Sequence, residues 1–203
     1  MEIYEDMEQG SPEWYEARLG SIGGSSIAAV CAKGKGKMRM NLMFQLAGEL
    51  LSGQKAENYT NKYMERGLEF EPQARDLYAE TTGHEVRQVG LIQRRPFVHY
   101  SPDGIVVYGK WRGLLEIKTN IPSVFCRTVA SDEVPPEYIK QIQWGLACGY
   151  DWCDYVAYCP EIRIRPYWVK RVHRDDKLIE EMDREADSFL ADMLKIIKTV
   201  RGG

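Results

Sequence analysis

The sequence SPDGIVVYGKWRGLLEIK at residues 101–118 decides the fold that we predict. Two short stretches with the pattern of β-strands, IVVY and LLEIK, lie on either side of a glycine-lysine pair. That pair fits a two-residue hairpin turn of type II′, which takes glycine in its first position. Tyr108 then pairs with Trp111, and counting back along the hairpin sets Asp103 directly opposite Glu116.

This register brings two carboxylates and a lysine onto one face of the sheet. Glu116 and Lys118 are two residues apart on a strand and share a face, whereas Leu115 and Ile117 point the other way, into a core. Opposed residues have Cβ atoms about 5 Å apart, so Asp103 and Glu116 would repel each other unless a cation lay between them. Mg²⁺ takes one or two carboxylates and keeps waters, and Lys118 could then contact a metal-bound water or a phosphate. A solvated strand face remains the alternative, and a bulge would shift the register by one residue.

The other elements follow from hydrophobic periodicity and from helix start and stop signals. We expect helices over 11–20, from about 25, and over 38–51, 60–82, 124–130, 136–148 and 175–200, with a kink or a new start at Pro72. We expect strands over 86–94, 97–100, 105–108, 114–118, 152–159 and 164–172. This order fits an α/β (α+β) fold with a central mixed sheet flanked by helices. No composition break marks a linker, so 1–203 is expected to form a single domain.

Composition excludes several classes of protein. No apolar run approaches the roughly 20 residues of a membrane span, and the acidic N-terminus lacks a signal pattern, so we expect a cytoplasmic protein and no membrane partner. The five cysteines form no CxxC pair, which argues against a disulfide framework and a zinc site. The net charge of −3 does not by itself indicate nucleic-acid binding, which would need local basic patches here.

Four blocks of the sequence resemble known nucleases. SPDG followed by LEIK resembles the PD-(D/E)xK nuclease motif, with Asp103, Glu116 and Lys118 as its three members. The block WYEARLG with the following GGSS, within 14–26, resembles the N-terminal block of the lambda exonuclease (YqaJ-type viral recombinase) family of phage alkaline exonucleases. RGLEFEPQAR and YIKQIQ resemble two helices of the same family. The resemblance runs from residue 14 to about residue 144, and it implies a restriction-endonuclease-like core.

The resemblance also implies an activity. Such enzymes use Mg²⁺, for which Mn²⁺ may substitute, with one or two ions per active site. They are 5′-to-3′ exodeoxyribonucleases that degrade the 5′-ended strand of linear double-stranded DNA and leave a 3′ single-stranded overhang. They bind DNA ends as ring-shaped homotrimers and work beside a single-strand annealing protein in phage recombination. A phage or prophage gene expressed in a bacterial host cytoplasm would be its setting.

The same resemblance assigns roles to single residues. Arg18 and Ser25 would bind the 5′-phosphate of the DNA end, which suits a planar guanidinium and a hydroxyl at a helix start. Gln141 would position the attacking water or the phosphate, and the neighbouring Gln143 could take its place. Glu71 would be a third carboxylate, helping to hold a second metal ion or to orient water. The predicted metal ligands are Asp103, Glu116, Ile117 and Glu71, and the predicted chemistry is metal-assisted hydrolysis.

A basic, glycine-loosened segment provides a further prediction. Contacts with the DNA backbone are expected from Lys33, Lys35, Lys37 and Arg39, although solvated lysines on a loop give the same pattern. Two other functions stay open. The same core serves endonucleases and repair nucleases that cut internally, and a catalytically silent DNA-binding module would also keep the fold. An intact set of Asp103, Glu116, Lys118 and Glu71 argues against the silent module.

Overall fold

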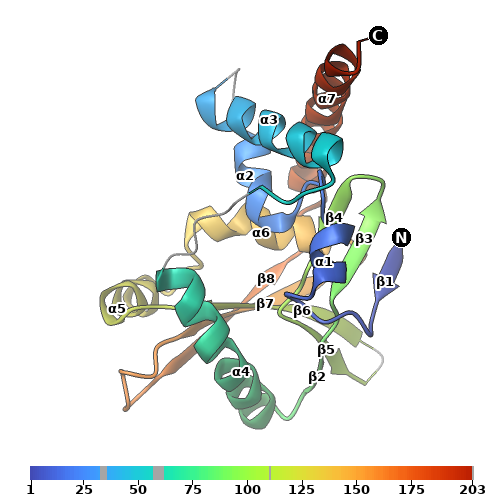
Figure 1. The fold of residues 1–203 in the computed structure, drawn as a ribbon. Helices are drawn as coiled ribbons and strands as arrows, with labels where there is room; N and C mark the ends of the chain where they lie inside the picture. Colours follow the sequence, from blue (N-terminus) through green and yellow to red (C-terminus); the bar gives the residue numbers. More distant parts are fainter. Residues whose placement is uncertain (33–35, 57–61, 110, 203) are drawn as a thin grey trace.

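Two β-sheets form the centre of the molecule, and helices pack around them (Figure 1). The computed structural model describes residues 1–32, 36–56, 62–109 and 111–202 of the 203-residue chain. The larger sheet has the strand order β2-β5-β6-β7-β8, and the smaller sheet has the order β1-β3-β4. Neighbouring strands are antiparallel except β6 and β7, which run parallel. The predicted mixed sheet flanked by helices is therefore confirmed.

The larger sheet contains most of residues 101–118, the stretch from which the fold was predicted. Its strands are β2 Glu85–Arg87, β5 Gly104–Tyr108, β6 Trp111–Thr119, β7 Trp152–Tyr158 and β8 Tyr167–His173. The parallel neighbours β6 and β7 need a long connection, because a tight turn can join only antiparallel strands. Helices α5 (Pro122–Ser131) and α6 (Pro136–Leu146) make that connection.

The hairpin between β5 and β6 has the predicted register. Tyr108 pairs with Trp111, and the pairing continues to Gly104 and Leu115. One further step along the same register places Asp103 beside Glu116, as counting back from the turn predicts. Gly109 has a φ of +58°, a left-handed conformation that glycine adopts without strain; residue 110 lies outside the described residues.

The prediction of one strand over 86–94 is wrong. The chain there forms β2 in the larger sheet and then β3 (Leu91–Arg95) in the smaller sheet, beside β4 (Val98–Tyr100). The cause is an N-terminal strand that the sequence did not reveal, β1 (Glu2–Tyr4), which pairs with β3. Gly90 donates its N–H to the Tyr4 carbonyl, and a Cβ at Gly90 would lie only 2.2 Å from the Met7 carbonyl oxygen. Only glycine at position 90 therefore lets this segment lie so close to the backbone of Met7.

The remaining helices lie close to their predicted positions. They are α1 Pro12–Ala17, the short 3₁₀ helix η1 Gly24–Ser26, α2 Ile27–Val30, α3 Lys37–Ser52, α4 Lys62–Thr82 and α7 Asp176–Val200. Ser11 caps α1 by accepting the N–H of Trp14 at 3.2 Å, as its position before proline predicts. Helix α4 runs across Pro72 instead of starting anew there.

The larger sheet has helices on both faces. On one face, Leu115 and Ile117 are buried with Ala74 and Tyr78 of α4. On the other face, the alternate residue Leu114 is buried in a larger core that includes side chains of α5 and α6. This alternation confirms that Leu115 and Ile117 point into a core, and it leaves Glu116 and Lys118 facing the side of α6.

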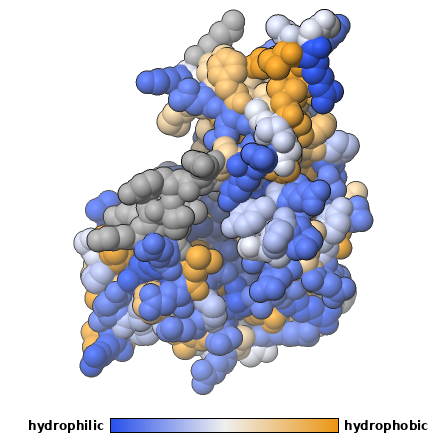
Figure 2. Space-filling view, viewed as in Figure 1, coloured by the Kyte–Doolittle hydropathy of each residue, from blue (hydrophilic) through white to orange (hydrophobic). Residues whose placement is uncertain are grey.

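Helices α3 and α7 pack against each other at one end of the molecule (Figure 1). The buried face of α7 includes Met182, Phe189 and Met193, so this helix contributes to the core. Figure 2 shows hydrophobic residues at the surface of this end, and mainly hydrophilic residues around a hollow lower on the same face. Among the described residues, no helix has the length and apolar character needed to cross a membrane.

Candidate active site

A cavity of about 360 Å³ lies at the end of β6, between α4 and α6. The predicted catalytic residues share it, although they come from three separate parts of the chain. The lining includes Glu71, Asp103, Glu116, Ile117, Lys118 and Gln141. The fold thus brings the whole predicted catalytic set to one place.

The Glu116 carboxylate accepts three side-chain hydrogen bonds in this cavity. Its side chain is 1% exposed, and its Oε2 accepts a hydrogen bond from the Tyr100 hydroxyl at 2.6 Å. Its Oε1 accepts from the Lys118 ammonium and from the Gln141 amide, both at 2.5 Å. A buried carboxylate needs such partners, because losing its hydration without compensation is costly. These four side chains therefore form one connected polar group.

Asp103 closes the open end of the hairpin. Backbone pairing between β5 and β6 ends at Gly104 and Leu115, and the next free N–H of β6, that of Ile117, donates to Asp103 Oδ2 at 2.6 Å. In a strand, the N–H and C=O of one residue point to the same edge, so the Ile117 carbonyl oxygen also faces the Asp103 side. Asp103 and the Ile117 carbonyl thus offer oxygen ligands next to Glu116.

The carboxylates repel one another in the absence of a cation. Burial raises the pKa of Asp103 well above its ordinary value, and the carboxylates of Glu116 and Glu71 raise it further. An acid whose pKa is higher in the folded chain than in the unfolded chain destabilises the fold at any pH above its unfolded pKa of about 3.9. A divalent cation beside Asp103 and Glu116 would remove this cost.

The oxygen donors fit a hard cation that keeps part of its hydration shell. Among the described residues, no group of three or more histidine, cysteine, aspartate or glutamate side chains is arranged to hold a metal ion. Mg²⁺ does not require such a cage, because it binds through one or two carboxylates and retains waters. Asp103, Glu116 and the Ile117 carbonyl match that requirement.

Glu71 is held by a residue to which the sequence assigned no role. Arg75, one helical turn further along α4, forms an ion pair with Glu71, and its Nε donates to the Asp103 carbonyl at 2.8 Å. Burial raises the pKa of Glu71, and Glu116 adds to the rise, while Arg75 opposes it. Arg75 therefore links helix α4 to the SPDG segment and positions the Glu71 carboxylate at the cavity.

The pKa of Lys118 is raised, which favours its charged form. Burial alone would lower its pKa, but the carboxylates of Glu116 and Asp103 outweigh that effect and raise the pKa above its ordinary value. The ammonium also lies 5.2 Å from the centre of the Tyr138 ring. At neutral pH Lys118 is consequently a cation, suited to stabilising negative charge and unsuited to accepting a proton.

The two glutamines of α6 have separate tasks. Gln141 donates to Glu116 inside the cavity. Gln143 is buried elsewhere, where it donates to the His173 carbonyl at 2.8 Å and accepts the Asp175 N–H at 2.9 Å at the start of α7. Gln143 therefore has a structural role, and Gln141 is the glutamine of the site.

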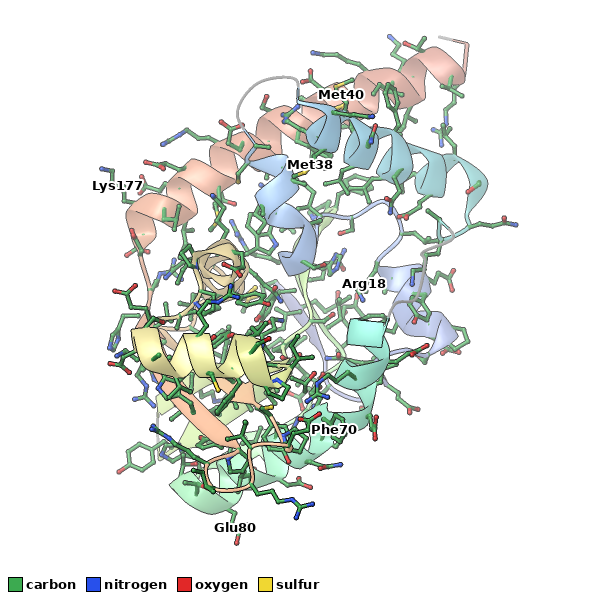
Figure 3. The ribbon with its side chains drawn as sticks, turned by 90° about the vertical axis from the view of Figure 1, so that its left-hand side faces the viewer. Arg18, Met38, Met40, Phe70, Glu80 and Lys177 are labelled. Carbon is green, nitrogen blue, oxygen red and sulfur yellow. The ribbon has the colours of Figure 1, made fainter. Side chains whose placement is uncertain are left out.

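A second cavity, of about 280 Å³, contains both residues predicted to bind a terminal phosphate. Arg18 and Ser25 line it. Figure 3 places Arg18 at the end of α1, near the centre of the molecule. Its guanidinium stacks on the Trp14 ring at 3.6 Å, and its Nε donates to His99 at 3.0 Å. Lys55, which lines the same cavity, provides a further cation.

One predicted DNA contact does not fit the structure. Arg39 is only 7% exposed: its Nε donates to the Val30 carbonyl at 3.2 Å, and its guanidinium lies 5.2 Å from the Phe189 ring centre. It lies inside the packing of α2, α3 and α7 and cannot reach a DNA phosphate from there. We therefore drop this prediction. Lys37 is exposed at the start of α3, and the predictions for positions 33 and 35 lie outside the described residues.

The chain is similar to known proteins over most of its length. A family model of the YqaJ-like viral recombinase domain matches residues 13–151. The crystal structure of an alkaline exonuclease (LHK-Exo) from Laribacter hongkongensis is 37% identical, with a TM-score of 0.85 over 94% of this chain and 96% of that chain. The structure of LHK-Exo in complex with dAMP has the same identity and coverage and a TM-score of 0.86.

A more distant structure shares the fold. The phage related exonuclease from Haemophilus somnus 129PT is 16% identical, with a TM-score of 0.65 over 89% of this chain and 96% of that chain. No curated protein matches the chain. The family model covers more than half of the 203 residues, including the first cavity and Arg18. The chain belongs to the YqaJ-like viral recombinase family.

Proposed function

We propose that this chain, an exodeoxyribonuclease of that family, depends on Mg²⁺ and degrades the 5′-ended strand of linear double-stranded DNA in the 5′-to-3′ direction. The product would be a duplex with a 3′ single-stranded overhang. The observation that carries this proposal is the pair of cavities. One contains a buried carboxylate group with a lysine, and the other contains an arginine that can bind a terminal phosphate.

The donor set of the first cavity supports metal-assisted hydrolysis. Asp103, Glu116 and the Ile117 carbonyl would hold Mg²⁺, or Mn²⁺ in its place, and Glu71 would serve a second ion. The bound cation would lower the pKa of water and neutralise charge on the scissile phosphate. Lys118 would stabilise the charge that develops on that phosphate.

The second cavity supports cutting from an end. A guanidinium that lines an open cavity offers paired N–H groups to a phosphate that carries two free charges, as a 5′-terminal phosphate does. Ser25, exposed in η1, adds a hydroxyl group. An endonuclease would have no need of such a site, so this cavity favours the exonuclease over an enzyme that cuts internally.

The assembly and setting are extensions of the same proposal. They rest on family membership: a ring-shaped homotrimer around the duplex, and action beside a single-strand annealing protein in recombination of phage or prophage DNA in a bacterial cytoplasm. Light scattering in solution measures the first. Co-purification with a co-encoded annealing protein measures the second.

The test of the central proposal compares three DNA substrates. We expect linear duplex with 5′-phosphates to be degraded in Mg²⁺, with loss of a 5′ label before a 3′ label. Linear duplex with 5′-hydroxyl ends should react more slowly, and closed circles should survive. EDTA should stop the reaction on all of them. Nicking of the circle at the rate of the linear duplex would replace the exonuclease by an endonuclease, and loss of the 3′ label first would reverse the polarity.

Tyr100 provides a prediction about the support of the catalytic glutamate. Its hydroxyl is the partner of Glu116 Oε2, and its ring is 1% exposed. Replacing Tyr100 by phenylalanine keeps the ring and removes one hydrogen bond to a metal-binding carboxylate, a change that typically lowers metal affinity or activity about 10- to 100-fold. A titration of activity with Mg²⁺ should show a higher half-saturating concentration. Tyr158→Phe is the matched control, because that hydroxyl meets Gln73 at 3.4 Å, away from Glu116.

A further inference from the structure

Strand β4 connects the two cavities. His99 and Tyr100 are neighbours on this strand, and both are buried. The Tyr100 hydroxyl reaches Glu116 in the catalytic cavity, whereas His99 bonds to Arg18 in the second cavity. One short strand therefore supports a key residue of each site.

His99 presents a single acceptor to Arg18. Its ring is 3% exposed, its Nε2 accepts the Arg18 Nε–H at 3.0 Å, and its Nδ1 lies 2.8 Å from the Ser21 hydroxyl. Because Nε2 accepts, the ring proton must be on Nδ1, where it can be donated to Ser21. Burial, together with the charge of Arg18, lowers the pKa of His99 to about 3, which keeps the ring neutral.

This contact leaves the two terminal guanidinium nitrogens of Arg18 free. The bond to His99 uses Nε, and the Trp14 ring covers one face of the guanidinium. Within the described part of the chain, no side chain or carbonyl accepts a hydrogen bond from the two terminal nitrogens of Arg18. Burial lowers the pKa of Arg18 only to about 10, so the group is charged at neutral pH. The terminal nitrogens are thus available for a phosphate.

His99 is itself fixed from several sides. Its backbone N–H donates to the Ile22 carbonyl at 3.0 Å, and its carbonyl accepts the indole N–H of Trp144 at 3.1 Å. A Cβ at Gly23 would lie 2.6 Å from the imidazole Nε2, so only glycine lets this loop lie against the ring. These contacts hold the residue that bonds to Arg18 in one position, which favours preorganised binding of a phosphate.

We propose that His99 is a positioning residue for end recognition: it fixes the Arg18 guanidinium so that both terminal nitrogens point at the 5′-phosphate. The proposal rests on the assignment of Arg18 as the phosphate-binding residue in the proposed function. It predicts that His99 affects the preference for phosphorylated ends and leaves the chemical step unchanged.

The test measures binding without cleavage. Fluorescence anisotropy in EDTA gives Kd for a short duplex with 5′-phosphate ends and for the same duplex with 5′-hydroxyl ends, and the ratio of the two is the phosphate preference. His99→Leu should reduce this preference about tenfold or more, as expected when a hydrogen bond that orients a charged group is lost. His99→Gln, which can keep an acceptor near the position of Nε2, should retain most of it. In Mg²⁺, His99→Leu should raise KM on phosphorylated ends and leave kcat unchanged.

Controls separate the inference from the proposed function. His84→Leu, at a half-buried histidine outside both cavities, should keep the wild-type preference. If Arg18→Ala abolishes the preference and His99→Leu retains it, the role of His99 is refuted while the phosphate site stands. If Arg18→Ala also retains it, the phosphate site itself is refuted, and the role of His99 with it. Should His99→Leu fail to fold, Ser21→Ala decides the question: an unchanged preference overturns the proposal, and a loss of about threefold supports it.

Discussion

Replacing Glu116 by glutamine is expected to lower kcat on linear duplex DNA by about 1000-fold or more, at the upper end of effects seen when one group that stabilises a transition state is removed. The amide keeps the size of the side chain but loses the negative charge. Its neutral oxygen should bind a divalent cation far more weakly than the carboxylate does, and it loses the charge that attracts the Lys118 ammonium, which lies 2.5 Å from Glu116 Oε1. One substitution thus removes the charge of the proposed metal ligand and the ion pair that holds Lys118.

The same variant should lose the stabilisation that a bound Mg²⁺ is expected to give to the fold. For the wild-type chain, binding of Mg²⁺ at 100 times its Kd would add about 2.7 kcal/mol of stability and would raise Tm by roughly 5–10 °C in a domain of this size. Glu116→Gln should show almost no such rise. Glu69→Gln is the matched control, because Glu69 is an exposed acid on α4 that does not line the cavity. A Glu116→Gln protein with full activity, or with a normal Mg²⁺-dependent rise in Tm, would refute the metal site.

The sequence was sufficient to place Asp103, Glu116 and Lys118 together because their arrangement depends on local rules. The turn at Gly109 fixes the register of the β5–β6 hairpin, and the alternation of a strand fixes which side chains share a face. Asp103, Glu116 and Lys118 therefore come together wherever this hairpin forms. Glu71 and Gln141, on two helices, could be placed only through the family resemblance, since no local rule relates them to the hairpin.

The residues that the sequence could not place depend on contacts between distant segments. Tyr100 and His99 are the partners of Glu116 and Arg18. The position of His99 near SPDG hints at a supporting role, but the sequence does not show which residue it or Tyr100 contacts. The prediction for Arg39 was wrong because its local pattern suggested a function that its position in the fold does not allow. Arg39 follows a basic loop and resembles a DNA contact, but its position on α3 faces α7, where packing buries it. Burial of this kind is decided by how helices pack, which the local pattern of charges does not reveal.

Replacing Lys118 by methionine is expected to lower kcat by about 100- to 1000-fold and to change KM little. Methionine fills a similar volume, so the change mainly removes a charge from the cavity. In the wild-type chain, burial alone would lower the pKa of Lys118, but Glu116 and Asp103 outweigh burial and raise it, which favours the ammonium form at neutral pH. We therefore expect Lys118 to act as a cation that stabilises charge on the phosphate.

The pH dependence of the two proteins separates this role from that of a general base. A lysine acting as base would make activity rise with pH through its own pKa, and Lys118→Met would abolish that rise. A lysine acting as a cation has a full effect below its raised pKa, so the ratio of wild-type to variant kcat should stay constant between pH 7 and pH 9, where an ordinary lysine pKa of about 10.4 has not yet been reached. Lys118→Arg should recover part of the activity because it restores the charge, and Lys195→Met, at an exposed lysine on α7, should behave as the wild-type protein. A ratio that grows with pH, or an arginine variant as inactive as the methionine variant, would assign the proton-accepting role to Lys118 instead.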